Sequence, residues 1–193
     1  MSRYKIAILV GSLRKDSINL KVARSICAFS GDRLDCNIVG IGDLPLYNQD
    51  YDADSPPQYD RFRQEILEAD GILFVSPEYN RGIPGVLKNA IDVGSRPYGK
   101  SVFNQKPAAI VTASPGSIGG FGSNHQIRQG GVFLNMPVMQ HPEAYLGRVS
   151  DDSFDSDGCL KDGPLKELIL GLSKAFADWV QMIHDARGLL AAR

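Results

Sequence analysis

The sequence has little of what several classes of protein need. It contains three cysteines (Cys27, Cys36 and Cys159) with no CxxC pair and no cysteine–histidine spacing typical of a metal site. We therefore expect no disulfide framework and no metal centre. No apolar run approaches the roughly 20 residues that a membrane helix needs. The net charge of −1 at pH 7 gives no reason to expect nucleic acid or an anionic membrane as a partner.

What the chain does have is the balance of an ordinary globular protein, with 43% hydrophobic and 22% charged residues. Its 193 residues suffice for one hydrophobic core. No linker-like stretch or internal repeat divides them, so we expect a single domain over residues 1–193. An apolar strand is predicted from residue 4, which leaves no room for a secretion signal. We therefore expect the cytoplasm as its compartment.

Strand-like and helix-like segments alternate along the chain. Continuous apolar runs, typical of strands covered on both faces, occupy residues 4–11 and 71–76. Further strands are predicted at 34–41, where apolar residues alternate, at 107–114, and in the short segment 137–140. Segments with helical spacing of apolar residues occupy 18–30, 59–70, 85–94, 124–136 and 163–187. This alternation predicts an α/β fold with right-handed crossovers. Five strands favour the flavodoxin-like three-layer sandwich, with a five-stranded parallel sheet in the order 2-1-3-4-5.

The topology also predicts where a ligand binds. In an open parallel sheet, ligands bind beyond the carboxyl ends of the strands, near the point where the strand order reverses. In this order, that point lies beside strands 1, 3 and 4. The segments that follow those strands are "GSLRKDSIN" (11–19), "PEYNRG" (77–82) and "SPGSIGG" (114–120). We expect these three loops to meet at one edge of the sheet.

The first loop has the composition of a phosphate site. It precedes a helix, whose amino terminus offers unpaired N–H groups and the positive end of a dipole. Ser12 and Ser17 add hydroxyl donors, Arg14 adds a planar guanidinium suited to phosphate oxygens, and Asn19 adds a donor or a cap. The plainer alternative is that one residue of the loop only caps the helix.

The loop lacks the motifs of the common dinucleotide and triphosphate sites. It has neither GxxxxGK[ST] nor GxGxxG, which are the signatures of a nucleotide triphosphatase loop and of a pyrophosphate turn. A single terminal phosphate fits it better. The loop therefore favours a mononucleotide such as FMN.

The other two loops have features of a ring-binding site. Glycines in 114–120 allow the backbone to approach a planar ligand closely, although a flexible turn is the alternative. In the loop 77–82, Pro77 stiffens the exit from the strand. The backbone of the residues after it is placed to hydrogen-bond a ring edge, with Tyr79 beside the ring. Simple helix caps at Glu78 or Asn80 are the alternative.

At these residues the sequence resembles the NADPH-dependent FMN reductase family, and within it the bacterial flavoproteins described as chromate or quinone reductases. The segments "GSLRKDSIN", "SPEYNRGIPGVLKNAID" and "ASPGSIGG" occur in the expected order and spacing, and the resemblance covers almost the whole chain. It implies a flavodoxin-like fold, bound FMN, hydride acceptance from NADPH or NADH, and a homodimer or homotetramer. It also implies a cofactor-binding set, which comprises Ser12, Arg14, Ser17, Asn19, Leu20, Pro77, Glu78, Tyr79, Asn80, Ser114, Gly116, Gly119 and Gly120.

Two arginines extend this set as candidate sites for an anionic substrate or for the coenzyme phosphates. Arg81 directly follows the sequence PEYN, where relatives often carry an uncharged residue. Arg96 lies in the polar connection 94–106. Each is equally well interpreted as a solvated surface charge.

These observations predict an FMN-dependent NAD(P)H oxidoreductase. Because FMN carries the hydride chemistry, no catalytic side chain is expected. We expect a ping-pong cycle, with a quinone, flavin, azo compound or metal anion such as chromate as small-molecule acceptor. The first alternative is a flavodoxin-type electron carrier that does not itself oxidise NAD(P)H. The second is a nucleotide-binding regulatory module with no redox role.

Overall fold

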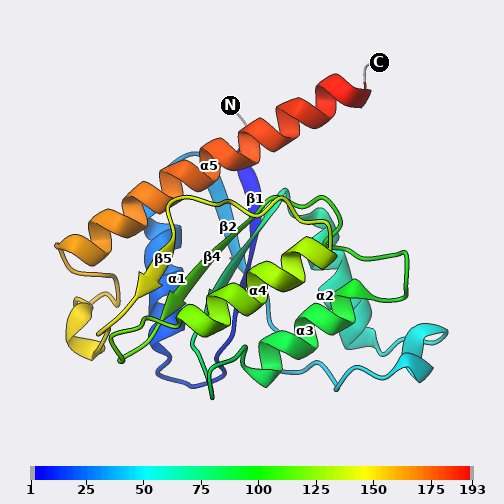
Figure 1. Ribbon diagram of the computed structural model, residues 1–193, viewed down its shortest axis with the longest axis horizontal. Coiled ribbons are helices and arrows are strands. Elements are labelled where there is room, and N and C mark those ends of the chain that lie inside the picture. The colour runs from blue at the N-terminus through cyan, green and yellow to red at the C-terminus, as the bar shows by residue number, and fades with distance from the viewer. Residues whose placement is uncertain (1–2, 192–193) are drawn as a thin grey trace.

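The structure, a computed structural model, describes residues 3–191 and has alternating strands and helices (Figure 1). The strands are β1 (Tyr4–Val10), β2 (Leu34–Ile38), β3 (Gly71–Ser76), β4 (Ala108–Ala113) and β5 (Ala144–Leu146). The α-helices are α1 (Ile18–Phe29), α2 (Pro57–Glu68), α3 (Gly85–Ser95), α4 (Phe121–Phe133) and α5 (Pro164–Ala191). Two 3₁₀ turns are η1 (Gln49–Asp52) and η2 (Asp151–Ser153).

The sheet confirms the predicted fold. Its order is β2-β1-β3-β4-β5, and every neighbouring pair is parallel. Strands β3 and β4 are buried along their whole length, which explains why they appear in the sequence as continuous apolar runs rather than alternating ones. No helix within residues 3–191 is long and apolar enough to cross a membrane.

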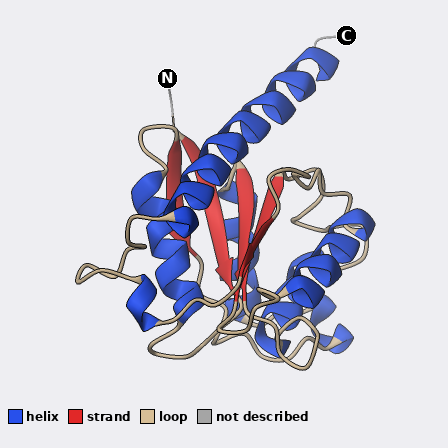
Figure 2. Ribbon diagram, turned by 60° about the vertical axis from the view of Figure 1, so that its left-hand side comes forward, coloured by secondary structure: helices blue, strands red, loops and turns tan. Residues whose placement is uncertain are grey.

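Helices cover both faces of the sheet (Figure 2), and the side-chain alternation of β1 shows how. Ile6 and Ile8 pack into the core that α1 and α5 complete. Ala7 and Leu9 point the other way, into the core with α2, α3 and α4. The result is the three-layer sandwich that the alternation predicted.

The prediction of the fifth strand at 137–140 is wrong. That segment makes only an isolated bridge, between Val138 and Ala108, and the fifth strand is Ala144–Leu146. Pro137 is the first residue of this segment, and Pro142 follows two residues after its end. A proline has no N–H to continue a ladder of hydrogen bonds. Helix α4 also begins at Phe121, three residues before the predicted start, and this brings its amino end to the third loop.

Candidate functional site

The loops that follow β1, β3 and β4 meet at one edge of the sheet, the lower edge in Figure 1. They enclose a cleft of about 100 Å³. The cleft is lined by Ser12, Arg14, Ser17, Ile18, Asn19, Pro77, Glu78, Tyr79, Ala113, Ser114 and Pro115. The expected convergence of the three loops is therefore observed in the structure.

The first loop ends in a capped helix. Ser17 is the N-cap of α1, and its hydroxyl accepts a hydrogen bond from the backbone N–H of Leu20 at 3.2 Å. Ser12 accepts a hydrogen bond from the N–H of Arg14 at 3.4 Å, while the Arg14 side chain is exposed. The capping alternative for Ser17 is thus correct, but it accounts for only one of the polar residues in the loop.

Asn19 provides a test of whether the cleft suits FMN. Its side chain is buried, and its Nδ2 donates to the carbonyl oxygen of Ala113 at 3.2 Å. Its Oδ1 is buried and accepts no hydrogen bond from the described residues. Buried acceptors normally have partners, so a ligand hydroxyl would complete this one. With a guanidinium and serine hydroxyls in the same cleft, the donor and acceptor set fits a ribityl phosphate.

The second loop is a two-residue hairpin. Tyr79 and Gly82 exchange two backbone hydrogen bonds, of 3.1 and 2.9 Å. The residues between them, Asn80 and Arg81, have φ values of 52° and 66°. Asparagine tolerates this left-handed region, but it costs arginine roughly 1–2 kcal/mol. The surrounding structure must therefore hold this turn in place.

The carboxylate of Glu78 is directed to α4. Its Oε2 accepts hydrogen bonds from the backbone N–H groups of Gly122 at 2.6 Å and Ser123 at 3.2 Å. Glu78 therefore does cap a helix, although not the helix that follows it in sequence. What it offers a ring in the cleft is its backbone.

The glycines of the third loop have different roles. A Cβ added to Gly119 would lie 2.6 Å from the carbonyl carbon of Tyr145, and one added to Gly120 would lie 2.8 Å from the Thr112 side chain. Both also have φ above 60°, so packing and conformation already require glycine there. Gly116 has only the Ser114 hydroxyl nearby, at 3.4 Å. Gly116 is thus the glycine of this loop left open to a ligand.

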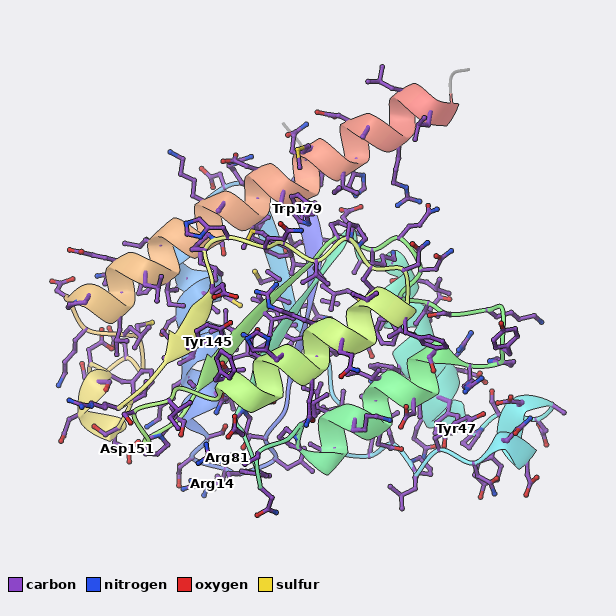
Figure 3. All side chains as sticks on the ribbon, viewed as in Figure 1. Arg14, Tyr47, Arg81, Tyr145, Asp151 and Trp179 are labelled. Atoms are coloured by element: carbon purple, nitrogen blue, oxygen red, sulfur yellow. The ribbon has the colours of Figure 1, made fainter. Side chains whose placement is uncertain are left out.

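The two candidate arginines lie at opposite edges of the sheet. Figure 3 shows Arg81 at the same edge as Arg14, and its exposed guanidinium lies 3.4 Å from Glu78. Helix α3 carries the chain back to the other edge, so Arg96 lies where β4 begins. There it lines a groove of about 340 Å³ with Tyr98 and Phe133. Within one chain, the structure does not bring Arg96 to the three loops.

Two charged residues near the first loop were not predicted. Lys21 and Asp151 form an ion pair at 2.6 Å, and Asp151 lies on the same side of the molecule as Arg14 (Figure 3). The hydrogen bond from Lys21, followed by its charge, lowers the pKa of Asp151 below its ordinary value. No local sequence pattern joins residues 21 and 151, so this contact becomes visible only in the fold.

An aromatic cluster beside the third loop was also missed. The hydroxyl of Tyr145 lies 3.2 Å from Nε2 of His125, whose ring is 4.0 Å from that of Phe121. Burial, followed by the nearby Glu143, raises the pKa of Tyr145 to about 12. The sequence did not predict this cluster because it placed the fifth strand at 137–140, whereas Tyr145 lies in the observed β5.

Comparison with known proteins agrees with this geometry. Residues 4–151 match the model of the NADPH-dependent FMN reductase family. A quinone reductase of Pseudomonas putida is 53% identical, over 93% of this chain and 96% of that protein. A 2-hydroxy-1,4-benzoquinone reductase of a Burkholderia species is 40% identical, over 92% and 96%.

A solved structure gives the same result. The flavoenzyme FerB of Paracoccus denitrificans, an NAD(P)H:(acceptor) oxidoreductase, superposes with a TM-score of 0.88 at 37% identity. The match covers 93% of this chain and 98% of FerB. Both the match to the family model and these identities extend over most of the chain, and the chain belongs to the NADPH-dependent FMN reductase family.

Proposed function

We propose that this protein is an FMN-dependent NAD(P)H oxidoreductase that reduces quinones. Family membership makes FMN its cofactor and NAD(P)H its electron donor, and the relatives named quinone reductase support the acceptor class. The observation that carries the proposal is the cleft at the three loops. Its buried, unpartnered Asn19 Oδ1 suits a bound flavin mononucleotide better than a solvent-filled surface.

The residues of the cleft divide the work of binding. Ser12, Arg14 and Ser17 hold the phosphate at the amino end of α1, where the helix dipole favours an anion. The backbone of residues 77–80 and the open face of Gly116 border the ring and the ribityl chain. When bound, FMN supplies the hydride and electron transfer, so these residues need only bind, orient and stabilise charge.

The finer features of the cycle are also proposals. We place NAD(P)H and the acceptor in the same opening in turn, in a ping-pong order, because the three loops form one cleft. Acceptors then include free flavins, azo compounds and anions such as chromate as well as quinones. Arg81, exposed at the rim, attracts the coenzyme phosphates or an anionic acceptor by its charge.

The assembly and the compartment complete the proposal. We infer a homodimer or homotetramer, and Arg96 acts at the site only if a second copy brings it there. We place the protein in the cytoplasm, where Cys27, Cys36 and Cys159 would remain reduced.

The test is an absorption spectrum of the purified protein, followed by anaerobic addition of NADPH or NADH. The proposal expects a yellow protein that bleaches. It also expects parallel lines in double-reciprocal plots of initial rate against coenzyme concentration at several fixed quinone concentrations. A yellow protein that does not bleach would instead indicate a flavodoxin-type carrier. A colourless protein that takes up no FMN would overturn the cofactor assignment.

A further inference from the structure

Helix α4 has no cap of its own. Its N-cap residue is Gly120, with φ of 82° and no side chain to accept a hydrogen bond. The N–H groups of a first helical turn need partners, and those of Gly122 and Ser123 find one in Glu78. This carboxylate comes from the turn after β3, 44 residues away from Gly122 in the chain.

A second side chain joins the same two segments one helical turn further along. Gln126 of α4 accepts a hydrogen bond from the N–H of Ile83 at 3.0 Å, and its Nε2 lies 3.4 Å from the carbonyl oxygen of Arg81. The amide thus pairs with the backbone on one side of the hairpin, as a neighbouring strand would. Ser76 and Ser123 add a buried hydroxyl contact of 3.3 Å between β3 and α4.

The close approach leaves no space for larger residues. A Cβ on Gly122 would lie 2.8 Å from the carbonyl oxygen of Arg81 and 2.9 Å from Oε2 of Glu78. One on Gly82 would lie 3.1 Å from Oε1 of Gln126. At Gly122 the backbone of α4 therefore packs on the backbone of the hairpin, and at Gly82 the hairpin packs on the Gln126 side chain. Because both contacts are close, a displacement of α4 would displace the hairpin with it.

We propose that Glu78 and Gln126, together called the clamp, are positioning residues for FMN. They hold residues 77–82 against α4, and through that backbone they fix the donors and acceptors that meet the ring. The inference rests on the proposed function. The hairpin contains two non-glycine residues in the left-handed region, a conformation that persists only when surrounding contacts determine it. The clamp supplies those contacts.

The charge of Glu78 gives the clamp a second effect. The carboxylate of Glu78 is directed to α4, but Glu78 is one of the residues that line the cleft. Its negative charge is therefore near the proposed flavin and opposes the reduction of FMN. Replacement by glutamine keeps the size and one oxygen acceptor but removes the charge. We expect Glu78→Gln to move the midpoint potential of bound FMN to more positive values, a change that a purely structural contact would not produce.

The experiment compares four variants with the wild-type holoprotein: Glu78→Ala, Glu78→Gln, Gln126→Ala and Gln129→Ala. The last is the matched control, because Gln129 is exposed on α4 and makes none of the clamp's contacts. FMN affinity is measured by fluorescence quenching on addition of the apoprotein. The visible circular dichroism of bound FMN reports how the ring is held, and the midpoint potential is measured by redox titration.

We expect Glu78→Ala and Gln126→Ala each to weaken FMN binding about tenfold, the usual effect of one lost hydrogen-bonded contact, and to alter the visible circular dichroism. Glu78→Gln should keep its affinity within a few-fold and raise the potential. Gln129→Ala should match the wild type. If Glu78→Ala does not fold, Gln126→Ala and Glu78→Gln still decide, because both keep an acceptor for the N–H groups of Gly122 and Ser123.

Wild-type affinity and dichroism in Glu78→Ala and Gln126→Ala would overturn the inference, even if their melting temperatures fell, since the clamp would then stabilise only the fold. Failure of the wild-type protein itself to take up FMN would overturn the proposed function, and the inference with it. The two failures are distinguishable because only the second affects every protein in the series.

Discussion

The amino ends of α1 and α4 both point to the edge of the sheet where the site lies, but their N–H groups are capped in different ways. Helix α1 is capped by its own Ser17, a neutral hydroxyl. Helix α4 has a glycine at that position and takes a carboxylate from Glu78. Each helix presents the positive end of a dipole, but an anion already occupies the second. Of these two helices, only α1 remains open to a phosphate.

The surroundings of the two ends extend the difference. The exposed cation Arg14 stands beside the end of α1, whereas Arg81 near α4 faces the carboxylate of Glu78 at 3.4 Å. The two ends of the cleft therefore differ in charge. At α1 the positive charge of Arg14 is exposed, whereas at α4 the carboxylate of Glu78 neutralises the positive end of the helix. We propose that this difference gives FMN one direction in which to bind, with its phosphate at α1 and its ring toward α4.

The largest effect is expected when the amino end of α1 is given an anionic cap, as the amino end of α4 has. Ser17→Asp keeps a good N-cap but places a carboxylate where we propose that the phosphate binds. Two like charges about 4 Å apart, at an effective dielectric constant of about 20, repel by about 4 kcal/mol, which is roughly a thousandfold in affinity. We expect FMN binding to fall by about that factor, as measured by fluorescence titration of the apoprotein.

Two controls accompany this variant. Ser17→Thr keeps the hydroxyl without adding charge and should bind FMN within a few-fold of the wild type. Riboflavin, which has no phosphate, should bind Ser17→Asp and the wild type alike. Equal FMN affinity in Ser17→Asp and the wild type would show that the phosphate lies elsewhere.

A smaller effect is expected from the exposed cation on the α1 side. Arg14→Ala removes a charged donor but no buried packing. Hydrogen bonds to charged groups are worth about 1.5–3 kcal/mol, so FMN binding should weaken by about 10- to 100-fold, with riboflavin binding and apoprotein stability unchanged. An equal loss for riboflavin would instead mean that Arg14 supports the loop and not the phosphate.

The α4 side is best tested through its glycines. A Cβ on Gly122 would meet the carbonyl oxygen of Arg81 at 2.8 Å, whereas one on Gly130 of the same helix would have nothing within 4 Å. Gly122→Ala should lower the free energy of unfolding by about 1–3 kcal/mol, measured by urea denaturation of the apoprotein. Gly130→Ala should raise it by up to about 1 kcal/mol, because alanine favours helix. Equal stability of the two variants would contradict the close packing at the amino end of α4.

The sequence was sufficient for most of the fold because the fold depends on local patterns. Continuous apolar runs marked β1, β3 and β4, and an alternating segment marked β2. The alternation of these strands with helices predicted the order of the sheet. The prediction of the fifth strand failed because this strand has only three residues, too few to show a pattern. The apolar segment before it was predicted to be the strand, although Pro137 begins that segment and Pro142 follows it.

The site was predicted in part for a related reason. Residue types and topology placed three loops at one edge, but the contact of Glu78 with Gly122 spans 44 residues and leaves no local pattern. Nor does composition distinguish Gly116, which is open, from Gly119, which is packed. Arg96 is a different case. The same alternation that placed the loops also sends the end of α3 to the opposite edge, so the topology already argued against that assignment.

The smallest expected effect concerns the ion pair that borders the α1 side. Lys21 holds the pKa of Asp151 below its ordinary value of 3.8. A lowered carboxyl pKa contributes stability that is present above the unfolded pKa and disappears as pH falls through the folded one. Asp151→Asn should therefore lower the melting temperature slightly at neutral pH, and the difference should shrink once the pH falls below 3.8 and through the lowered pKa of Asp151. Asp152→Asn, whose carboxyl forms no ion pair with Lys21, is the control and should show no such trend. If the difference in melting temperature persisted unchanged at low pH, the effect of Asp151 would come from packing or from the η2 turn. The Lys21–Asp151 ion pair would then not stabilise the α1 side of the site.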